Sequence, residues 1–261
     1  MNVSSLFGIF LASIVVVFGI LSGANWKMFI DAHAFIIVAG GTISATFISF
    51  PLSQILKIFK IFSSKVMGKS ASYVYVIEEI INLSRGQFND DQFLTNNLLK
   101  IQSPFLREAV ELQIAGGIPD AKIDSILKKR VDFHFLKFEE ESHLFKTVAR
   151  FPPAFGLLGA VSGMIALMSG IASPDAFKTI GPSMAVALVA TLYGIALANF
   201  ILIPLGENVS KWNKEDRLMR SIVLDGLKLL RQKEHPLVVE EHLKSYLLSS
   251  DRQKLNIKKA S

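Results

Sequence analysis

Few side chains in the apolar half of this 261-residue chain are of a type that does chemistry. Ser162, in the stretch GAVSG, could act as a nucleophile only beside a general base, and no long uncharged segment has a histidine in its interior. His33 lies at the edge of such a segment, where a solvated imidazole is expected. Elsewhere there is no glycine-rich phosphate loop, pair of catalytic carboxylates or histidine cluster at metal-ligand spacing. The sequence therefore predicts a protein that is not an enzyme and holds no cofactor.

The distribution of charge predicts the elements that position the remaining residues. Uncharged segments of 26, 25, 24 and 28 residues cover residues 1–26, 32–56, 151–174 and 179–206. A helix needs about 20 apolar residues to cross the hydrocarbon core of a membrane. We therefore predict four membrane-spanning helices. The first has no basic start and no convincing cleavage site, so we expect it to be retained.

The basic residues lie on one side of these spans. Of the 28 Lys and Arg residues, 14 lie between spans two and three and 12 follow span four, which leaves only Lys27 and Lys178 for the other two connections. The positive-inside rule then places both termini and the long middle segment in the cytoplasm. Twenty acidic residues accompany them, which is typical of a solvated helical surface and not of a nucleic-acid-binding arm.

The sequence outside the spans has helical patterns and no persistent strand pattern. Helices are expected to end at Gly86 and at Gly116–Gly117, and a helix capped by Asp120 is expected to run as a rod into Pro152. Beyond span four, apolar residues recur at helical spacing at Leu218, Ile222, Val223, Leu227 and Leu230.

The predicted fold class is an all-α integral membrane protein. It has four transmembrane helices, a large helical cytoplasmic domain between spans two and three, and a helical cytoplasmic C-terminal tail. The predicted boundaries are 1–52 for spans one and two, 53–150 for the cytoplasmic domain, 151–205 for spans three and four, and 206–261 for the tail.

Spans three and four carry small residues at regular spacing, which lets helix backbones approach closely in lipid. These residues either pack the two spans on each other within one chain or also meet a further partner. Their spread over more than one side favours the second interpretation. The residues are Gly156, Gly159, Gly163, Ala187, Ala190 and Gly194.

None of the four spans contains Asp, Glu, Lys or Arg, the side chains that usually mark a proton relay in a membrane. If the chain handles protons, the titrating group must therefore come from another chain.

Two long stretches carry a family resemblance. FPPAFGLLGAVSGMIALM and GPSMAVALVATLYGIALANFILIPL closely resemble the third and fourth membrane helices of the MotA/PomA stator subunits of the bacterial flagellar motor, in the MotA/TolQ/ExbB superfamily. IVAGGTISA in span two and FLREAVELQIAGGIPDAKIDSILKKR in the middle segment are also similar to that family. The resemblance implies a subunit of the bacterial inner membrane that converts ion flow into torque.

The resemblance also implies an assembly. Five copies would surround a dimer of a MotB- or PomB-type partner, whose single membrane helix carries the missing acid, an aspartate. The small residues of spans three and four would then line the channel that holds the partner helices. Pro153 and Pro204 match two prolines that are important to the conformational cycle in this family. Proline can hinge a helix or simply begin one, and we favour the simple beginning for Pro152.

Thr191 matches a threonine that lies near the ion site in this family. Its hydroxyl offers a donor and acceptors in an apolar wall, unless it bonds only to its own helix. Sodium-driven members carry a second threonine in span three, where this chain has Ala160. Because two hydroxyls replace a sodium hydration shell better than one, we expect the coupling ion to be H⁺ and not Na⁺.

The family places charges early in the middle segment to contact the rotor protein FliG. Here that part reads INLSRGQFNDDQFLTNNLLKIQ, and the family's downstream glutamates are absent. Arg85 is the expected basic contact, with Asp90, Asp91 and Lys100 as further candidates. Solvated helix faces are the alternative for all four.

Two other functions remain open from the sequence. An ExbB/TolQ-type energiser of an outer-membrane process would use a similar ring, but such subunits have three spans with one before the cytoplasmic part. A scaffolding membrane protein without ion coupling would be insensitive to changes at Thr191 or Pro153.

Overall fold

The computed structural model describes residues 26–56, 73–171, 176–249 and 251–252, with a few isolated positions before residue 26. Every regular element within these ranges is helical, which confirms the all-α class. The described chain has three helices that are long and apolar enough to cross a membrane, covering Trp26–Ser49, Asp120–Gly170 and Ile180–Arg231. They contain predicted spans two, three and four. Predicted span one lies outside the described residues except at isolated positions, so the four-span prediction stays a prediction.

The chain divides into two compact units. The first combines Met1–Ser70 with Glu139–Ser210, and the second combines Ala71–Phe138 with Lys211–Ser261. These divisions differ from the predicted boundaries because two long helices, α8 (Asp120–Val148) and α11 (Ile203–Arg231), contribute to both units. Within the first unit, the Ser142 hydroxyl donates to the Gly206 carbonyl at 3.1 Å.

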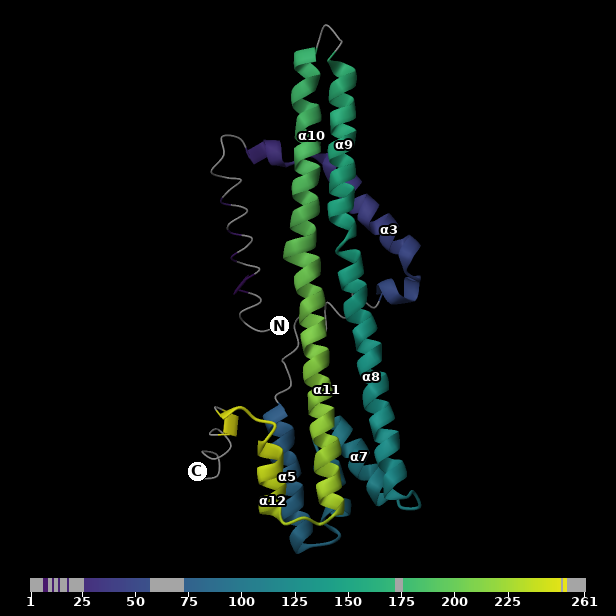
Figure 1. Cartoon of the computed structure of the whole chain (residues 1–261), viewed down its shortest axis with the longest axis vertical. Helices are drawn as coiled ribbons and strands as arrows, with labels where there is room; N and C mark the ends of the chain where they lie inside the picture. The colour runs from purple at the N-terminus through teal and green to yellow at the C-terminus, as the bar shows by residue number, and fades with distance from the viewer. Residues whose placement is uncertain are drawn as a thin grey trace. The chain divides into compact units, whose positions relative to one another are not determined.

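The first unit is built around a helical hairpin. Helix α9 (Phe151–Gly170) and helix α10 (Ala176–Ala196) lie side by side, as Figure 1 shows. Helix α9 begins at Phe151 after a two-residue turn, so the rod predicted to run into Pro152 ends at Val148. Helix α10 leads into a π-helical stretch, η4 (Leu197–Leu202), and then into α11.

The second span crosses this hairpin in Figure 1 and packs against it. A short 3₁₀ turn, η1 (Trp26–Phe29), lies in the connection before the span. The span itself runs through α2 (Ala32–Phe35), η2 (Ile36–Gly40) and α3 (Gly41–Ser49). It ends at Phe50, whose backbone is extended because the next residue is Pro51.

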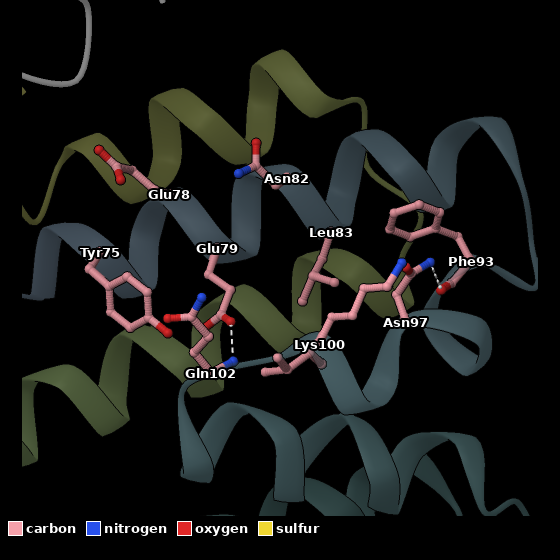
Figure 2. A pocket seen from close by; sticks show the side chains of 10 residues that line it. Tyr75, Glu78, Glu79, Asn82, Leu83, Phe93, Asn97, Lys100 and Gln102 are labelled. Carbon is pink, nitrogen blue, oxygen red and sulfur yellow. Dashed lines mark hydrogen bonds between the residues drawn. The ribbon is translucent and has the colours of Figure 1, made fainter. Parts of the chain in front are cut away.

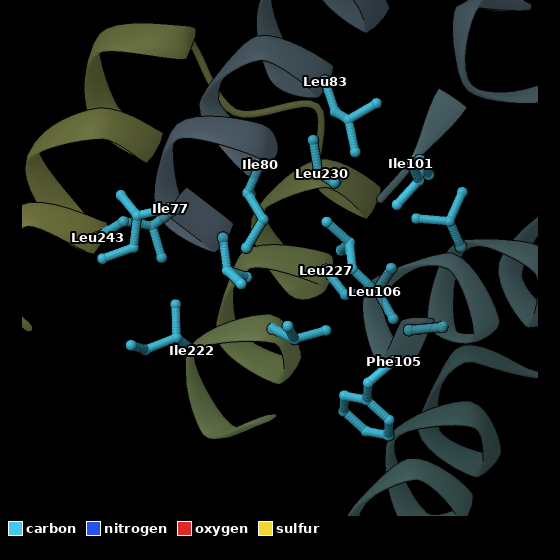
Figure 3. Packing of buried hydrophobic residues seen from close by; sticks show 14 of the residues in the cluster. Ile77, Ile80, Leu83, Ile101, Phe105, Leu106, Ile222, Leu227, Leu230 and Leu243 are labelled. Carbon is cyan, nitrogen blue, oxygen red and sulfur yellow. The ribbon is translucent and has the colours of Figure 1, made fainter. Parts of the chain in front are cut away.

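The second unit contains the shorter helices and the main apolar core. Its elements are α5 (Tyr73–Asn89), α6 (Phe93–Asn97), η3 (Leu98–Lys100), α7 (Pro104–Ile114) and α12 (Pro236–Lys244), with parts of α8 and α11. Figure 3 shows the core side chains converging from α5, α7, α11 and α12, with Ile77, Ile80, Leu106, Leu227 and Leu243 fully buried.

Two expectations for the helices need correction. Helix α5 does not end at Gly86 but continues to Asn89. Gly86 is needed for a contact instead, because a methyl group there would overlap the ring of Phe93. On α11, Leu218 is exposed although the other four predicted stripe residues are buried. By contrast, Gly116 and Gly117 end α7 as predicted, with φ of 68° and 76°, a region that favours glycine.

Candidate functional site

The seam between α9 and α10 consists of the small residues that the sequence singles out. A methyl group on Gly156 would lie 2.9 Å from the carbonyl oxygen of Ala190, and one on Gly163 would lie 2.7 Å from that of Ser183. Both distances are shorter than real Cβ contacts, and the obstructing atoms belong to the backbone. Only glycine therefore permits this approach of the two helices.

This seam is the packing within one chain that the sequence left open as an alternative. Gly156, Gly159 and Gly163 on α9 are buried, as are Ala187, Ala190 and Gly194 on α10. Their small surfaces face each other within the chain. That the six residues also line a channel around a partner stays a prediction.

The second span covers one side of the hairpin. Ala34 and Val38 form a buried cluster with Val189 and Ala190 of α10. On the same side, the ring of Phe155 packs against Gly41. Any side chain at position 41 would overlap this ring.

Tyr193 of α10 links this side to the connection before the second span. Its hydroxyl donates to the carbonyl of Phe29 at 2.6 Å and accepts from the backbone N–H of Asp31 at 3.3 Å. The Asp31 carboxylate in turn caps α2 by accepting from the Ala34 N–H at 2.8 Å. Tyr193 is not among the residues predicted from the sequence, although a tyrosine in an apolar span indicates that its hydroxyl has a partner.

No described helix packs against the opposite side of the hairpin. At 100° per residue, Ala190 and Gly194 face α9, Val189 and Tyr193 face the second span, and Thr191 points to the remaining side. The large apolar side chains on that side are exposed, namely Leu157, Met164, Met168, Met184, Leu188 and Ile195. This open side is uncharged.

Thr191 and Ala160 both lie half-buried at the edge of this open side. The Thr191 hydroxyl donates to the carbonyl of Ala187 at 3.1 Å, which is the local bond considered from sequence. Because the hydroxyl hydrogen of Thr191 is used in that bond, Thr191 can interact with a ligand only through the acceptor lone pairs of Oγ1. Ala160 offers no polar atom.

Both candidate hinge prolines lie where helix hydrogen bonding is interrupted. Pro153 is in the first turn of α9, directly after the turn at residues 149–150 that separates α9 from α8. Pro204 is the second residue of α11 and follows η4. A proline has no N–H and its ring clashes with the preceding turn, and the wider π-helical turn relieves that clash. Pro152 is buried, with its carbonyl against Gly194.

The four candidate rotor residues all lie in the second unit, and two of them have charged partners in the chain. The Arg85 guanidinium lies 3.1 Å from a carboxylate oxygen of Glu240, which is only 3% exposed. Asp91 pairs with Lys233. The carboxylate of Asp90 accepts from the backbone N–H of Gln92 at 2.9 Å.

Lys100 lines a groove of about 320 Å³, shown in Figure 2 with Tyr75, Glu79 and Asn97. The Glu79 carboxylate accepts from the backbone N–H of Gln102, at 2.5 Å, and so holds the chain just before α7. Burial raises the pKa of Tyr75, and the Glu79 charge adds to this effect. The groove is therefore mixed in charge, with Lys100 at its edge.

Comparison with known proteins agrees with this architecture. The model of the MotA/TolQ/ExbB proton channel family matches residues 97–222. The chemotaxis protein PomA of Vibrio alginolyticus is 27% identical over 252 residues, which cover 97% of this chain and 98% of PomA. Motility protein A of Borreliella burgdorferi is 28% identical over 230 residues, covering 88% and 87% of the two chains.

Solved structures show the same fold. The flagellar MotAB stator complex of Bacillus subtilis contains a chain that superimposes with a TM-score of 0.84 at 25% identity, covering 96% of this chain and 98% of that one. The MotAB structure of C. jejuni gives a TM-score of 0.85 at 20% identity, covering 95% and 97%. The likeness therefore extends over both compact units.

Proposed function

Because the model of the MotA/TolQ/ExbB proton channel family matches residues 97–222 and motility and chemotaxis proteins match nearly the whole chain, we propose that this chain is an ion-driven stator subunit of the bacterial flagellar motor. The observation that carries the proposal is the hairpin of α9 and α10. It closes its small residues on each other, lies against the second span on one side, and leaves an uncharged open side with Thr191 at its edge.

An uncharged surface cannot bind and release protons, so the acid must come from a partner. We infer a MotB/PomB-type subunit whose single membrane helix carries an aspartate. Its helix would lie along the open side of the hairpin, and five copies of this chain would surround a partner dimer. The assembly would sit in the bacterial inner membrane with both termini cytoplasmic, which the basic residues of the middle segment and the tail support.

The coupling ion in this proposal is the proton. One hydroxyl, that of Thr191, lies near the partner's acid, and Ala160 adds none. One charge crossing 100 mV delivers about 2.3 kcal/mol. Since about 1.4 kcal/mol changes an equilibrium tenfold, a single ion can bias a two-state ring by well over tenfold. Swimming speed that follows external sodium at a fixed proton-motive force would overturn this choice of ion.

The conformational cycle would act through the prolines. Pro153 and Pro204 lie at the cytoplasmic ends of the spans, where hydrogen bonding is already interrupted, so bending there breaks few bonds. The movement would reach the rotor protein FliG through the second unit. Among the candidates, neither Asp90 nor Lys100 forms an ion pair with a described residue, so both charges are available to the rotor. Arg85 and Asp91 would each exchange a partner within the chain for a rotor charge.

The family name also covers ExbB/TolQ-type energisers of outer-membrane processes. The motility and chemotaxis proteins that match nearly the whole chain favour the flagellar stator. Deleting the gene in its host separates the two functions. We expect cells that assemble flagella but do not rotate them, and that regain rotation with the parent gene. Normal motility combined with a defect in an outer-membrane process would favour the energiser.

A further inference from the structure

Asn199 places an amide on the exposed surface of the hairpin. It lies in the π-helical stretch η4, and its side chain is exposed. Its Nδ2 donates to the carbonyl of Ile195 at 3.0 Å. Among the described residues, no hydrogen bond to its Oδ1 is found, so this oxygen is available as an acceptor.

Asn199 is also an isolated polar group. Between Thr191 and Glu207 the only other polar side chain is Tyr193, which bonds to the connection before the second span. On α9, no residue between Arg150 and Ala160 has a polar side chain. The cytoplasmic half of the hairpin therefore presents a single uncommitted polar group.

The position of Asn199 relates it to Thr191. Steps of four residues lead from Thr191 through Ile195 to Asn199, and such steps keep to one side of a helix. Eight residues correspond to a rise of about 12 Å, which places Asn199 between the level of Thr191 and the cytoplasm. Within a membrane, polar side chains face a bundle interior or a water-filled cavity because exposure to lipid is costly. π-Helical turns, which change the direction of a side chain, are also frequent at functional sites.

We propose that Asn199 holds water on the cytoplasmic half of the ion path and so sets the rate at which ions leave the complex. This inference rests on the proposed function. The amide is not itself protonated. Its Oδ1 accepts a hydrogen bond from a water molecule, which receives a proton from the water above and passes one to the water below. The Nδ2 keeps its bond to Ile195, which fixes the direction of the oxygen.

The test measures proton uptake into vesicles that contain the complex of this chain and its partner, purified from the host membrane. Asn199→Leu keeps the size of the side chain and removes its polar atoms. Asn199→Thr keeps an acceptor and can bond to the preceding turn, as Thr191 does. Ser169→Ala serves as the matched control, because Ser169 is an exposed polar residue at the other end of α9 that bonds to the carbonyl of Ala166.

We expect Asn199→Leu to lower the maximal flux at least about tenfold, the effect of raising a barrier by about 1.4 kcal/mol. Because only exit is slowed, half-maximal flux should then occur at a lower external proton concentration. Asn199→Thr should keep most of the flux, and Ser169→Ala all of it. Full flux in Asn199→Leu would overturn the inference, as would loss of the partner from the purified Asn199→Leu complex, which would assign Asn199 to packing. A parent complex that conducts nothing would instead contradict the proposed function.

Discussion

The backbone of Gly194 in α10 lies directly against the carbonyl of Pro152 in α9, so that a methyl group on Gly194 would come within 2.5 Å of that oxygen. The end of the hairpin seam nearest α8 is thus fixed at Pro152, one residue before the candidate hinge Pro153. Any motion about Pro153 starts from this contact.

Gly194→Ala should therefore weaken the hairpin. The obstructing atom belongs to the backbone, so the helices must separate, at a cost of about 1–3 kcal/mol. Thermal unfolding of the purified protein in detergent measures this cost. Gly40→Ala is the matched control, because Gly40 also lies in a membrane helix and a methyl group there has open space. Equal stability of the two variants would show that the seam is looser than the structure indicates.

Tyr193→Phe should release the connection before the second span while keeping the packing of the ring on Phe35. Two hydrogen bonds are lost, worth roughly 1 kcal/mol each. Lys27 lies in this connection and is exposed, so trypsin cleavage after Lys27 should become faster. Unchanged cleavage would contradict the proposed role of Tyr193. Tyr73→Phe, in the second unit, controls for a general effect of removing a tyrosine hydroxyl.

Variants of Arg85 test whether this residue contacts the rotor or only forms an ion pair within the chain. Arg85→Glu should destabilise the contact between α5 and α12, because it places a second carboxylate beside the buried Glu240. Loss of motility in this variant would therefore not by itself assign a rotor contact.

Glu240 also pairs with Lys244 at 2.8 Å, so the triple variant Arg85→Glu, Glu240→Arg and Lys244→Glu separates the two roles. It reverses all three charges, which restores both pairs of Glu240 while keeping the reversed charge toward the rotor. If Arg85 contacts the rotor, the triple variant should recover stability toward urea and remain immotile. Recovery of both stability and motility would leave Arg85 with the structural role alone.

Tyr246 makes the second unit sensitive to alkaline pH. Its hydrogen bond to Asp225, supported by burial, raises the pKa of the phenol to about 12. A folded-state pKa above the unfolded value of 10.0 means that the protonated form stabilises the fold. The contribution is complete below pH 10 and is lost as the pH rises toward 12.

Tyr246→Phe should accordingly be less stable than the parent protein at pH 8, by about 1 kcal/mol. The difference should shrink steadily above pH 10. Urea unfolding followed by the fluorescence of Trp212, with Trp26 replaced by Phe, measures both stabilities. A difference that is constant from pH 8 to pH 11 would exclude the proposed hydrogen bond.

The sequence predicts the elements better than their contacts. Runs without charge locate the described spans, since the cost of placing a charge in lipid acts on each segment separately. The helix end at Gly116–Gly117 follows from local backbone preferences in the same way. The spacing of the glycines identifies the residues of the seam. It does not say which surface these residues face, because that surface depends on where the second span packs.

The features that could not be predicted from the sequence depend mainly on contacts between residues that are far apart in the chain. Tyr193 and Asp31 are 162 positions apart, and Gly86 matters only because Phe93 folds back onto α5. The π-helical stretch before Pro204 is not visible from composition, although the proline itself indicates strained hydrogen bonding.

Ion flux with and without the second subunit tests the central claim, that an acid from another chain carries ions past the uncharged open side of the hairpin. Vesicles containing this chain alone should take up protons no faster than protein-free vesicles. Those containing the complete complex should conduct, and replacing the partner's membrane aspartate by asparagine should abolish the flux. Conduction by this chain alone at the rate of the complete complex would contradict the account.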